Sequence, residues 1–269
     1  MKIEKKMIVP IVIGVVLLIA VVAGVAMKMR SSKTAEAPTT QKKKKTENFN
    51  TIAVAERPFL ELVPTDGGKN IIISVTSMKK PAKTVEYELE YQAGELLQGA
   101  FGSLDLATLP VTKEILFGSC SAGGACTYHT DIKGGTLVMR FAGGDQDYAL
   151  KSDWKYVDNA AKESSFASRD AKFQLESKDL AKARYMTILN SPGAPEGLTG
   201  TAISEIYSLR GTTALTGKAK VTIRMTEEAA GAKIMGYDGK AWKTLTTTVS
   251  GKEATADDAI YQVYVAVKL

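Results

Sequence analysis

Apolar and polar residues alternate with a period of two along much of the chain from Thr51 onward. The clearest run is VEYELEY at 85–91, in which Val, Tyr, Leu and Tyr share one face and three glutamates share the other. Successive side chains of a β-strand point to opposite faces, so this run predicts a half-buried strand. From 51 to 269 we find no long run of apolar residues at the spacing of an amphipathic helix.

The same alternation predicts further strands, which fall at 137–141, 148–156, 221–225, 245–249 and 261–267. Sequences rich in Gly, Pro, Asn and Asp separate these runs, and they are typical of turns: PTDGGKN, IKGG, GGDQD, NSPGAPEG and GYDGK. We expect short helical turns only near 158–163 and 177–184. Many short strands joined by polar turns predict antiparallel β-sandwiches.

The 219 residues from 51 to 269 are too many for one sandwich of the usual size. We therefore predict a mainly β chain with two antiparallel, immunoglobulin-like β-sandwich modules, at 51–157 and 158–269. The polar stretch DNAAKESSFASRD, which begins at Asp158, is the expected join.

The first fifty residues have a different pattern. Nineteen residues, 8–26, carry no charge, and as a helix they span about 28 Å, close to the thickness of the bilayer core. We predict a cytoplasmic tip and transmembrane anchor at 1–27. A cleaved signal peptide is the alternative, since Gly24-Val25-Ala26 offers small residues for cleavage, but the apolar run is longer than usual for one.

Residues 28–50 contain little that a fold can bury, and they predict a Lys-rich disordered linker. Lysines flank the apolar run on both sides almost equally, and Lys42 to Lys45 alone favour a cytoplasmic body. The cysteine spacing and the β-rich body favour the oxidising exterior. We expect a single-pass protein of the cell membrane with its C-terminal body extracytoplasmic.

Charge argues against nucleic acid as a partner. The formal net charge of +6 comes from residues 1–50, which hold ten Lys/Arg against three glutamates. The remaining residues hold 25 basic and 26 acidic side chains, so the body is nearly neutral. Lys42 to Lys45 form either a solvated spacer or a contact with anionic lipid or wall polymer.

Both cysteines and the single histidine lie in one stretch, GSCSAGGACTYH at 118–129. A hairpin with the five-residue loop 121–125 would place Cys120 opposite Cys126 and Gly118 opposite Tyr128. Directly opposed Cβ atoms lie about 4.5–5.5 Å apart, near the distance a disulfide needs. We predict a disulfide between Cys120 and Cys126.

Two chemical interpretations compete with the disulfide. Cys120, Cys126 and His129 could supply three zinc ligands, with Asp131 as a fourth, but the spacing matches no familiar zinc finger. The SCSAG sequence resembles a nucleophile elbow, but it begins with Ser119 rather than glycine and lacks an α/β setting. Residues three apart on a strand point to opposite faces, which excludes a Cys126–His129 pair. We predict no catalytic residue, no metal and no cofactor.

Three further features have two interpretations each. The row Glu86, Glu88 and Glu90 is either a solvated sheet face or a surface for a cation or a basic partner. The pairs Asp145/Asp147 and Asp257/Asp258 lack the spaced acidic series of a calcium loop, so we interpret both as turns.

Aromatic residues that alternate with polar ones belong in a sandwich core. Trp242, in GYDGKAWK, lies beside a turn and is our candidate ligand platform for a sugar.

The C-terminal run KAKVTIRM … AKIMGYDGKAWKTLTTTVSGKEATA … AIYQVYVAV resembles the end of surface β-sandwich modules of the immunoglobulin, fibronectin III or ZU5-like kind. The layout of anchor, Lys-rich linker and tandem sandwiches resembles small membrane-anchored surface proteins of bacteria. This resemblance implies no particular functional residues, and the chain lacks the Cys…Trp…Cys set of antibody domains.

These observations predict a non-enzymatic, membrane-anchored protein that presents β-sandwich modules for adhesion, envelope organisation or protein–protein contact. Its recognition surface is expected in loops or at an exposed strand edge. The alternative is an anchored carbohydrate- or cell-wall-binding module that uses Trp242.

Overall fold

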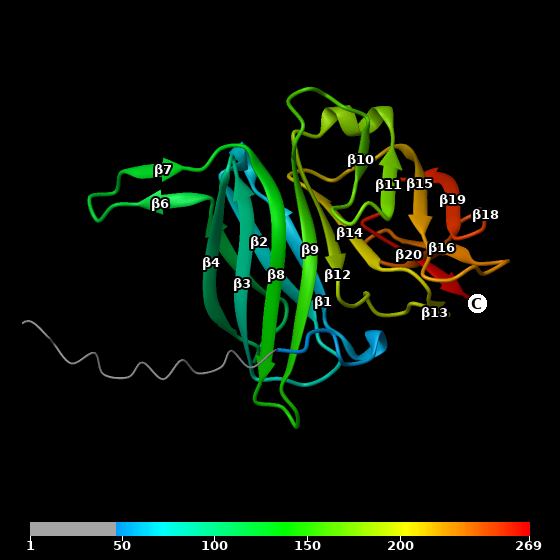
Figure 1. Cartoon of the computed structure of the whole chain (residues 1–269), viewed down its shortest axis with the longest axis horizontal. Helices are drawn as coiled ribbons and strands as arrows, with labels where there is room; N and C mark the ends of the chain where they lie inside the picture. Colours follow the sequence, from blue (N-terminus) through cyan, green and yellow to red (C-terminus); the bar gives the residue numbers. More distant parts are fainter. Residues whose placement is uncertain (1–46) are drawn as a thin grey trace, which may run out of the picture. The chain divides into compact units, whose positions relative to one another are not determined.

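Twenty β-strands and three short 3-10 helices make up residues 47–269, the part of the chain that the computed structural model describes (Figure 1). The 3-10 helices are η1 (Val54–Glu56), η2 (Asp66–Gly68) and η3 (Lys178–Lys182). No α-helix occurs in this part, and none of its helices is long and apolar enough to cross a membrane. The predicted anchor and nearly all of the predicted linker lie outside the described residues.

The largest sheet has ten strands, and every pairing in it is antiparallel. Its order is β17 (Trp242–Thr244), β16 (Lys233–Tyr237), β20 (Val263–Lys268), β14 (Ile206–Gly211), β12 (Tyr185–Ser191), β9 (Tyr148–Asp158), β8 (Ile132–Ala142), β3 (Thr84–Ala93) and β4 (Leu96–Asp105), with the short β13 (Thr201–Ala202) beside β20.

Two smaller antiparallel sheets each supply a second layer. One has the order β1 (Phe59–Pro64), β2 (Asn70–Ser77) and β5 (Val111–Leu116). The other has the order β10 (Ser165–Ala167), β11 (Phe173–Glu176), β15 (Lys218–Arg224), β19 (Glu253–Ala259) and β18 (Thr247–Ser250). A separate hairpin, β6 (Gly118–Cys120) and β7 (Cys126–Tyr128), projects away from these layers (Figure 1).

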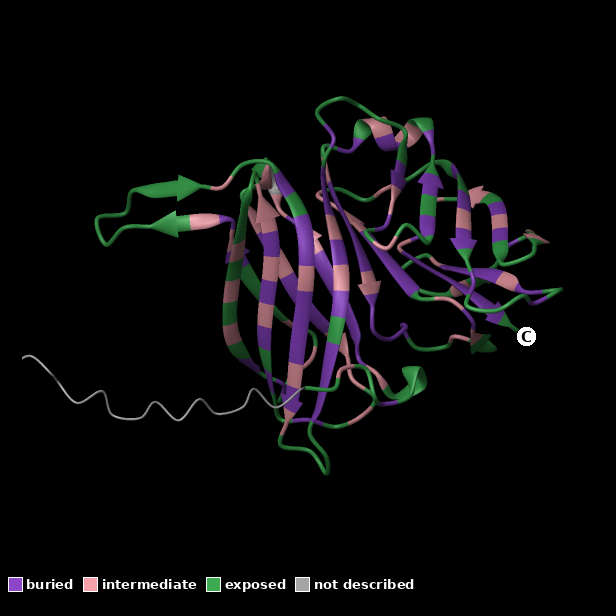
Figure 2. Cartoon of the chain, in the orientation of Figure 1, coloured by how far each residue is buried: buried purple, intermediate pink, exposed green. Residues whose placement is uncertain are grey.

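Two main hydrophobic cores form between the layers, which gives a sandwich-like fold. The first joins the three-stranded sheet to β3, β8 and β9, and includes the fully buried Trp154. The second joins the five-stranded sheet to β12, β14, β16 and β20, and includes Tyr207 and Tyr264. Figure 2 shows buried residues alternating with more exposed ones along β3 and β15, as the period of two requires, whereas β12, β14 and β20 are buried over most of their length.

The two halves are joined through the large sheet and through β1. Strand β9 pairs with β12 from Tyr185↔Asp158 to Leu189↔Trp154, so the sheet continues across the expected join at residue 158. The hydroxyls of Thr187 and Ser191 donate to backbone carbonyls of β1. The described residues therefore have two cores and one shared sheet. Independent folding of 51–157 and 158–269 stays a prediction.

Most predicted strands are present, and three local predictions were wrong. Residues 245–249 are not one strand, because the chain breaks at buried Leu245 between β17 and β18. Residues 158–163 form a turn without a helix, in which the Asn159 side-chain amide donates to the carbonyl of Glu163 and its oxygen accepts from the Glu163 N–H. Asp257 and Asp258 belong to β19 and not to a turn, with Asp257 opposite Lys220.

Candidate functional site

Strand β4 is an edge strand of the ten-stranded sheet, and it is more exposed than β3, the other strand of ten residues. It pairs with β3 over all ten residues, from Thr84↔Asp105 to Ala93↔Leu96. The connection is the two-residue turn Gly94-Glu95, in which Gly94 has a φ of 56°, a value that glycine adopts without strain. Within residues 47–269, β3 is the strand that is hydrogen-bonded to β4. The other edge of β4 has no strand paired with it, although β5 lies close to part of β4.

The open strand carries large apolar side chains in solvent. Its even-numbered residues from 98 to 104 are partly or fully buried, and its odd-numbered residues from 97 to 105 are exposed. Leu96 and Leu97 are each 65% exposed, and Phe101 is 85% exposed. These are three of the few large hydrophobic side chains that the described residues leave in solvent, and they lie on one strand.

Nothing in the β4 sequence discourages a partner strand. Natural edge strands are usually short, or carry lysine, proline or a bulge that prevents further pairing. The sequence LLQGAFGSLD contains no lysine and no proline, and its single charge is Asp105 at the end. The register with β3 has no irregularity. A long, regular and apolar edge of this kind is suited to the addition of a strand.

A row of carboxylates lies on β3, the strand next to β4, on the outer face of the sheet. Glu86, Glu88 and Glu90 of β3 pair in register with Ser103, Phe101 and Gly99 of β4.

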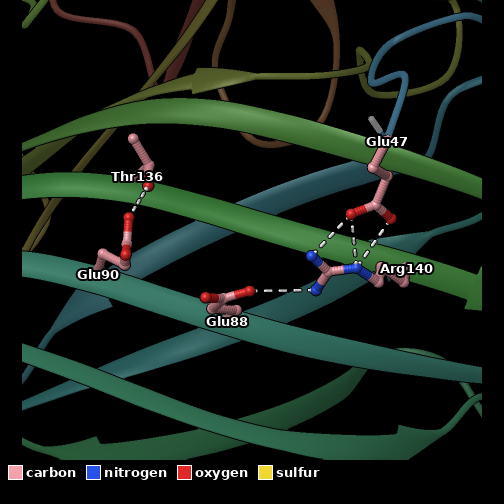
Figure 3. Close-up of polar contacts among 5 residues, drawn as sticks. All are labelled: Glu47, Glu88, Glu90, Thr136 and Arg140. Atoms are coloured by element: carbon pink, nitrogen blue, oxygen red, sulfur yellow. Dashed lines mark hydrogen bonds and ion pairs between the residues drawn. The ribbon is translucent and has the colours of Figure 1, made fainter. Parts of the chain in front are cut away.

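Arg140 of β8 partly neutralises this row (Figure 3). Its guanidinium donates to Glu47 at 2.8–3.0 Å and to Glu88 at 3.2 Å. The hydrogen bonds with Glu47 hold the pKa of Arg140 above its usual value. Thr136 donates to Glu90 at 2.9 Å. Glu86 is exposed and has no side-chain partner among residues 47–269, so the glutamate row keeps a net negative charge.

The hairpin that holds both cysteines has the register expected from its loop length. Gly118 pairs with Tyr128, and Cys120 with Cys126, whose sulfurs are joined in a disulfide. Both thiols are therefore occupied, and neither sulfur has a thiolate to offer a metal or a substrate. His129 lies outside the hairpin, where its Nδ1 is 3.0 Å from the hydroxyl of Tyr91. Within the described part, no group of three metal-ligating side chains converges.

A cavity of about 530 Å³ lies at the base of this hairpin. Lys69 lies over the Tyr128 ring at 4.2 Å from its centre, and Asp131 pairs with Lys133. The charged lining is balanced between three lysines and three carboxylates: Lys69, Lys133, Lys155, Asp131, Asp158 and Glu163. A lining without net charge gives no electrostatic preference for an anionic or a cationic ligand, so the cavity is a weaker candidate than the β4 edge.

Trp242, the candidate sugar platform, is half-buried on β17. Its ring packs against Tyr237 at 5.3 Å and its indole N–H donates to the carbonyl of Glu196 at 3.1 Å. It also contacts a small third core around Val263 and Val265. These contacts give Trp242 a packing role, and its role as a sugar platform stays a prediction.

No family model matches this chain, and no curated protein compared with it is detectably similar in sequence.

Sequence reasoning missed the exposed strand itself. It identified the glutamates of β3, because their alternation with buried residues is regular. The β4 sequence has apolar residues on both faces and two glycines, so it shows no alternation. The available signal was the turn Gly94-Glu95 followed by nine residues without a charge, 96–104.

Proposed function

We propose that this chain is a non-enzymatic, single-pass membrane-anchored protein that presents two immunoglobulin-like β-sandwich modules outside the cell for protein–protein contact. The uncharged run 8–26 supports the anchor, and the Cys120–Cys126 disulfide supports an oxidising compartment. The sandwich-like layers and the resemblance to bacterial surface proteins support the modules.

The contact that the geometry supports best is the addition of a partner strand to the open edge of β4. Phe101 carries this proposal: it is 85% exposed in the middle of a long edge strand that has none of the usual protection against pairing. Main-chain hydrogen bonds along β4 would provide affinity, while Leu97 and Phe101 would provide contact area for apolar side chains of the partner.

Photo-crosslinking in intact cells tests the contact. Benzoylphenylalanine at position 101 of the full chain keeps an aromatic side chain at the edge, and we expect it to yield a covalent adduct with a protein. The matched control is benzoylphenylalanine at Thr248, which is also exposed on an edge strand, β18. An adduct at 101 and none at 248 supports the proposal. Equal yields at both positions, or none, would overturn it.

A separate experiment tests the location. A membrane-impermeant amine reagent applied to intact cells should label lysines of the body, such as Lys252 and Lys113, which are exposed. Labelling only after lysis would place the body inside the cell and contradict this part of the proposal.

A further inference from the structure

We infer that the segment added to β4 is an extended peptide whose outward side chains alternate between apolar and basic. This inference rests on the proposed function, and it adds the chemistry of the partner. The register between β4 and the glutamate row of β3 defines which side chains a neighbouring strand would contact at each position.

The first half of the pattern comes from the apolar side chains. An added strand places its outward residues opposite the outward residues of β4. Two of these are Leu97 and Phe101, four residues apart and both exposed. Apolar residues of the partner at these two positions would remove both side chains from water, which favours binding in proportion to the buried apolar area.

The second half comes from the small outward residue that follows each of them two positions along β4. Gly99 and Ser103 leave gaps on the outward face, and behind these gaps lie Glu90 and Glu86, their direct neighbours in register. A partner strand opposite Gly99 is two strand spacings from β3, or about 10 Å. Lysine and arginine side chains can extend over a glycine or a serine across much of that distance, toward a glutamate that extends to meet them.

The electrostatics of the face favour the same chemistry. Arg140, the cation nearest the row, is engaged by Glu47 and Glu88. Glu86 has no side-chain partner in the described part, and Glu90 accepts only from the neutral hydroxyl of Thr136. Two carboxylates thus remain uncompensated beside the edge, and they would attract a basic segment and repel an acidic one.

A second copy of this chain fits the edge less well. If two β4 strands paired about Gly99, Leu97 of one copy would face Phe101 of the other. However, β4 has no basic residue to extend over Gly99, and the two acidic rows would approach each other. Charge complementarity therefore favours a basic partner, and a homodimer is an outcome for the experiment to detect.

Fluorescence anisotropy with labelled peptides tests the inference on the full chain in detergent. The probe is the peptide TVTKTVTKT, which presents Val and Lys alternately on one face. The peptide TVTETVTET reverses the charge, and TVTKPVTKT keeps the charge but cannot form a continuous ladder. We expect the first peptide to bind, and the other two to bind at least about tenfold more weakly.

Variants assign the effect to the glutamates. Glu86→Gln combined with Glu90→Gln should weaken binding of TVTKTVTKT about tenfold, since two charge pairs are lost at a partly exposed surface. Glu253→Gln on β19, which is also exposed, is the matched control and should change nothing. Phe101→Ser should abolish binding. Because Phe101 is exposed, this substitution should leave the fold intact, and circular dichroism would verify that it does.

The outcomes separate this inference from the proposed function. If the Lys and Glu peptides bind equally and only Phe101→Ser matters, the edge is a contact site but its partner is not basic, and the inference fails alone. If no peptide binds and Phe101→Ser dissociates a dimer in sedimentation velocity, the partner is a second copy, and the inference also fails. If no peptide binds, no dimer forms and position 101 gives no adduct in cells, the proposed function fails as well.

Discussion

The two edges of the ten-stranded sheet are built in opposite ways. Strand β4 has ten residues, no lysine, and an aromatic side chain, Phe101, that is 85% exposed. Strand β17 at the other edge has three residues, Lys243 among them, and its aromatic side chain, Trp242, is half-buried and hydrogen-bonded. Both edges belong to the same sheet, so the difference is not a property of the sheet as a whole.

Of the two edges, β17 is protected against pairing with a further strand and β4 is not. A short strand with a lysine offers few backbone groups to a partner, and it is a common way to close an edge. The β17 edge has these features and the β4 edge does not. An unprotected apolar edge carries a risk of aggregation, and the proposed partner strand would cover it.

The largest expected difference between the edges concerns stability. Trp242→Ala removes a half-buried ring that packs on Tyr237 and the third core, and we expect it to lower the free energy of unfolding by about 2 kcal/mol. Phe101→Ala removes a side chain that contacts little, and we expect a change within about 0.5 kcal/mol. Urea denaturation of the full chain in detergent measures both.

This pair of substitutions can contradict the comparison directly. A cost at Phe101 as large as that at Trp242 would mean that Phe101 is packed in solution, and the β4 edge would not be free. A negligible cost at Trp242, together with loss of binding to a sugar polymer, would instead favour the carbohydrate-binding alternative.

The same contrast explains what the sequence could predict. Strands β3, β8 and β9 were predictable because each has one buried face and therefore alternates. The disulfide hairpin was predictable because a five-residue loop determines which residues face each other. Strand β4 lacks alternation because its outer face is apolar and open. The property that makes it a candidate site also hides it from pattern analysis.

Long-range contacts could not be predicted from local patterns. The pairing of β9 with β12 joins the two predicted modules into one sheet, yet either strand alone is compatible with a separate sandwich. The contact between Glu47 and Arg140 spans 93 positions of the chain, and it depends on where the chain enters the outer face. Contacts of this kind follow from the assembled fold.

A second prediction closes the β4 edge artificially. Gly99→Lys places a lysine in the gap in front of Glu90, and there is room, since the nearest atom to an added Cβ is the carbonyl oxygen of Leu89 at 3.6 Å. We expect about a tenfold loss of affinity for TVTKTVTKT, because the new side chain occupies the gap and pairs with the glutamate.

The matched change at the other edge is Ala241→Lys, which is exposed immediately before β17. We expect it to leave the affinity unchanged. An equal loss from both lysines would show that the peptide responds to net charge and not to the β4 edge.

The smallest expected effect concerns the two turns that lead into the edge strands, the β3–β4 turn and the β16–β17 turn. Asp238 accepts backbone N–H groups of Lys240 and Ala241 at 2.9 and 2.8 Å and so holds the β16–β17 turn. Hydrogen bonds from Ala241 and then Lys240 lower the pKa of Asp238. The stabilising contribution of Asp238 is therefore complete above the usual aspartate pKa and is lost as pH falls through the lowered value.

The β3–β4 turn depends on a neutral contact, from the Gln92 amide to the carbonyl of Gly94 at 3.0 Å. Acid should therefore reduce hydrogen-exchange protection in β16–β17 slightly more than in β3–β4. Asp238→Asn should remove this difference, because an amide does not titrate in that range. If the difference persisted in Asp238→Asn, the carboxylate would not be its cause, and the β17 edge would owe its order to Trp242 and strand pairing alone.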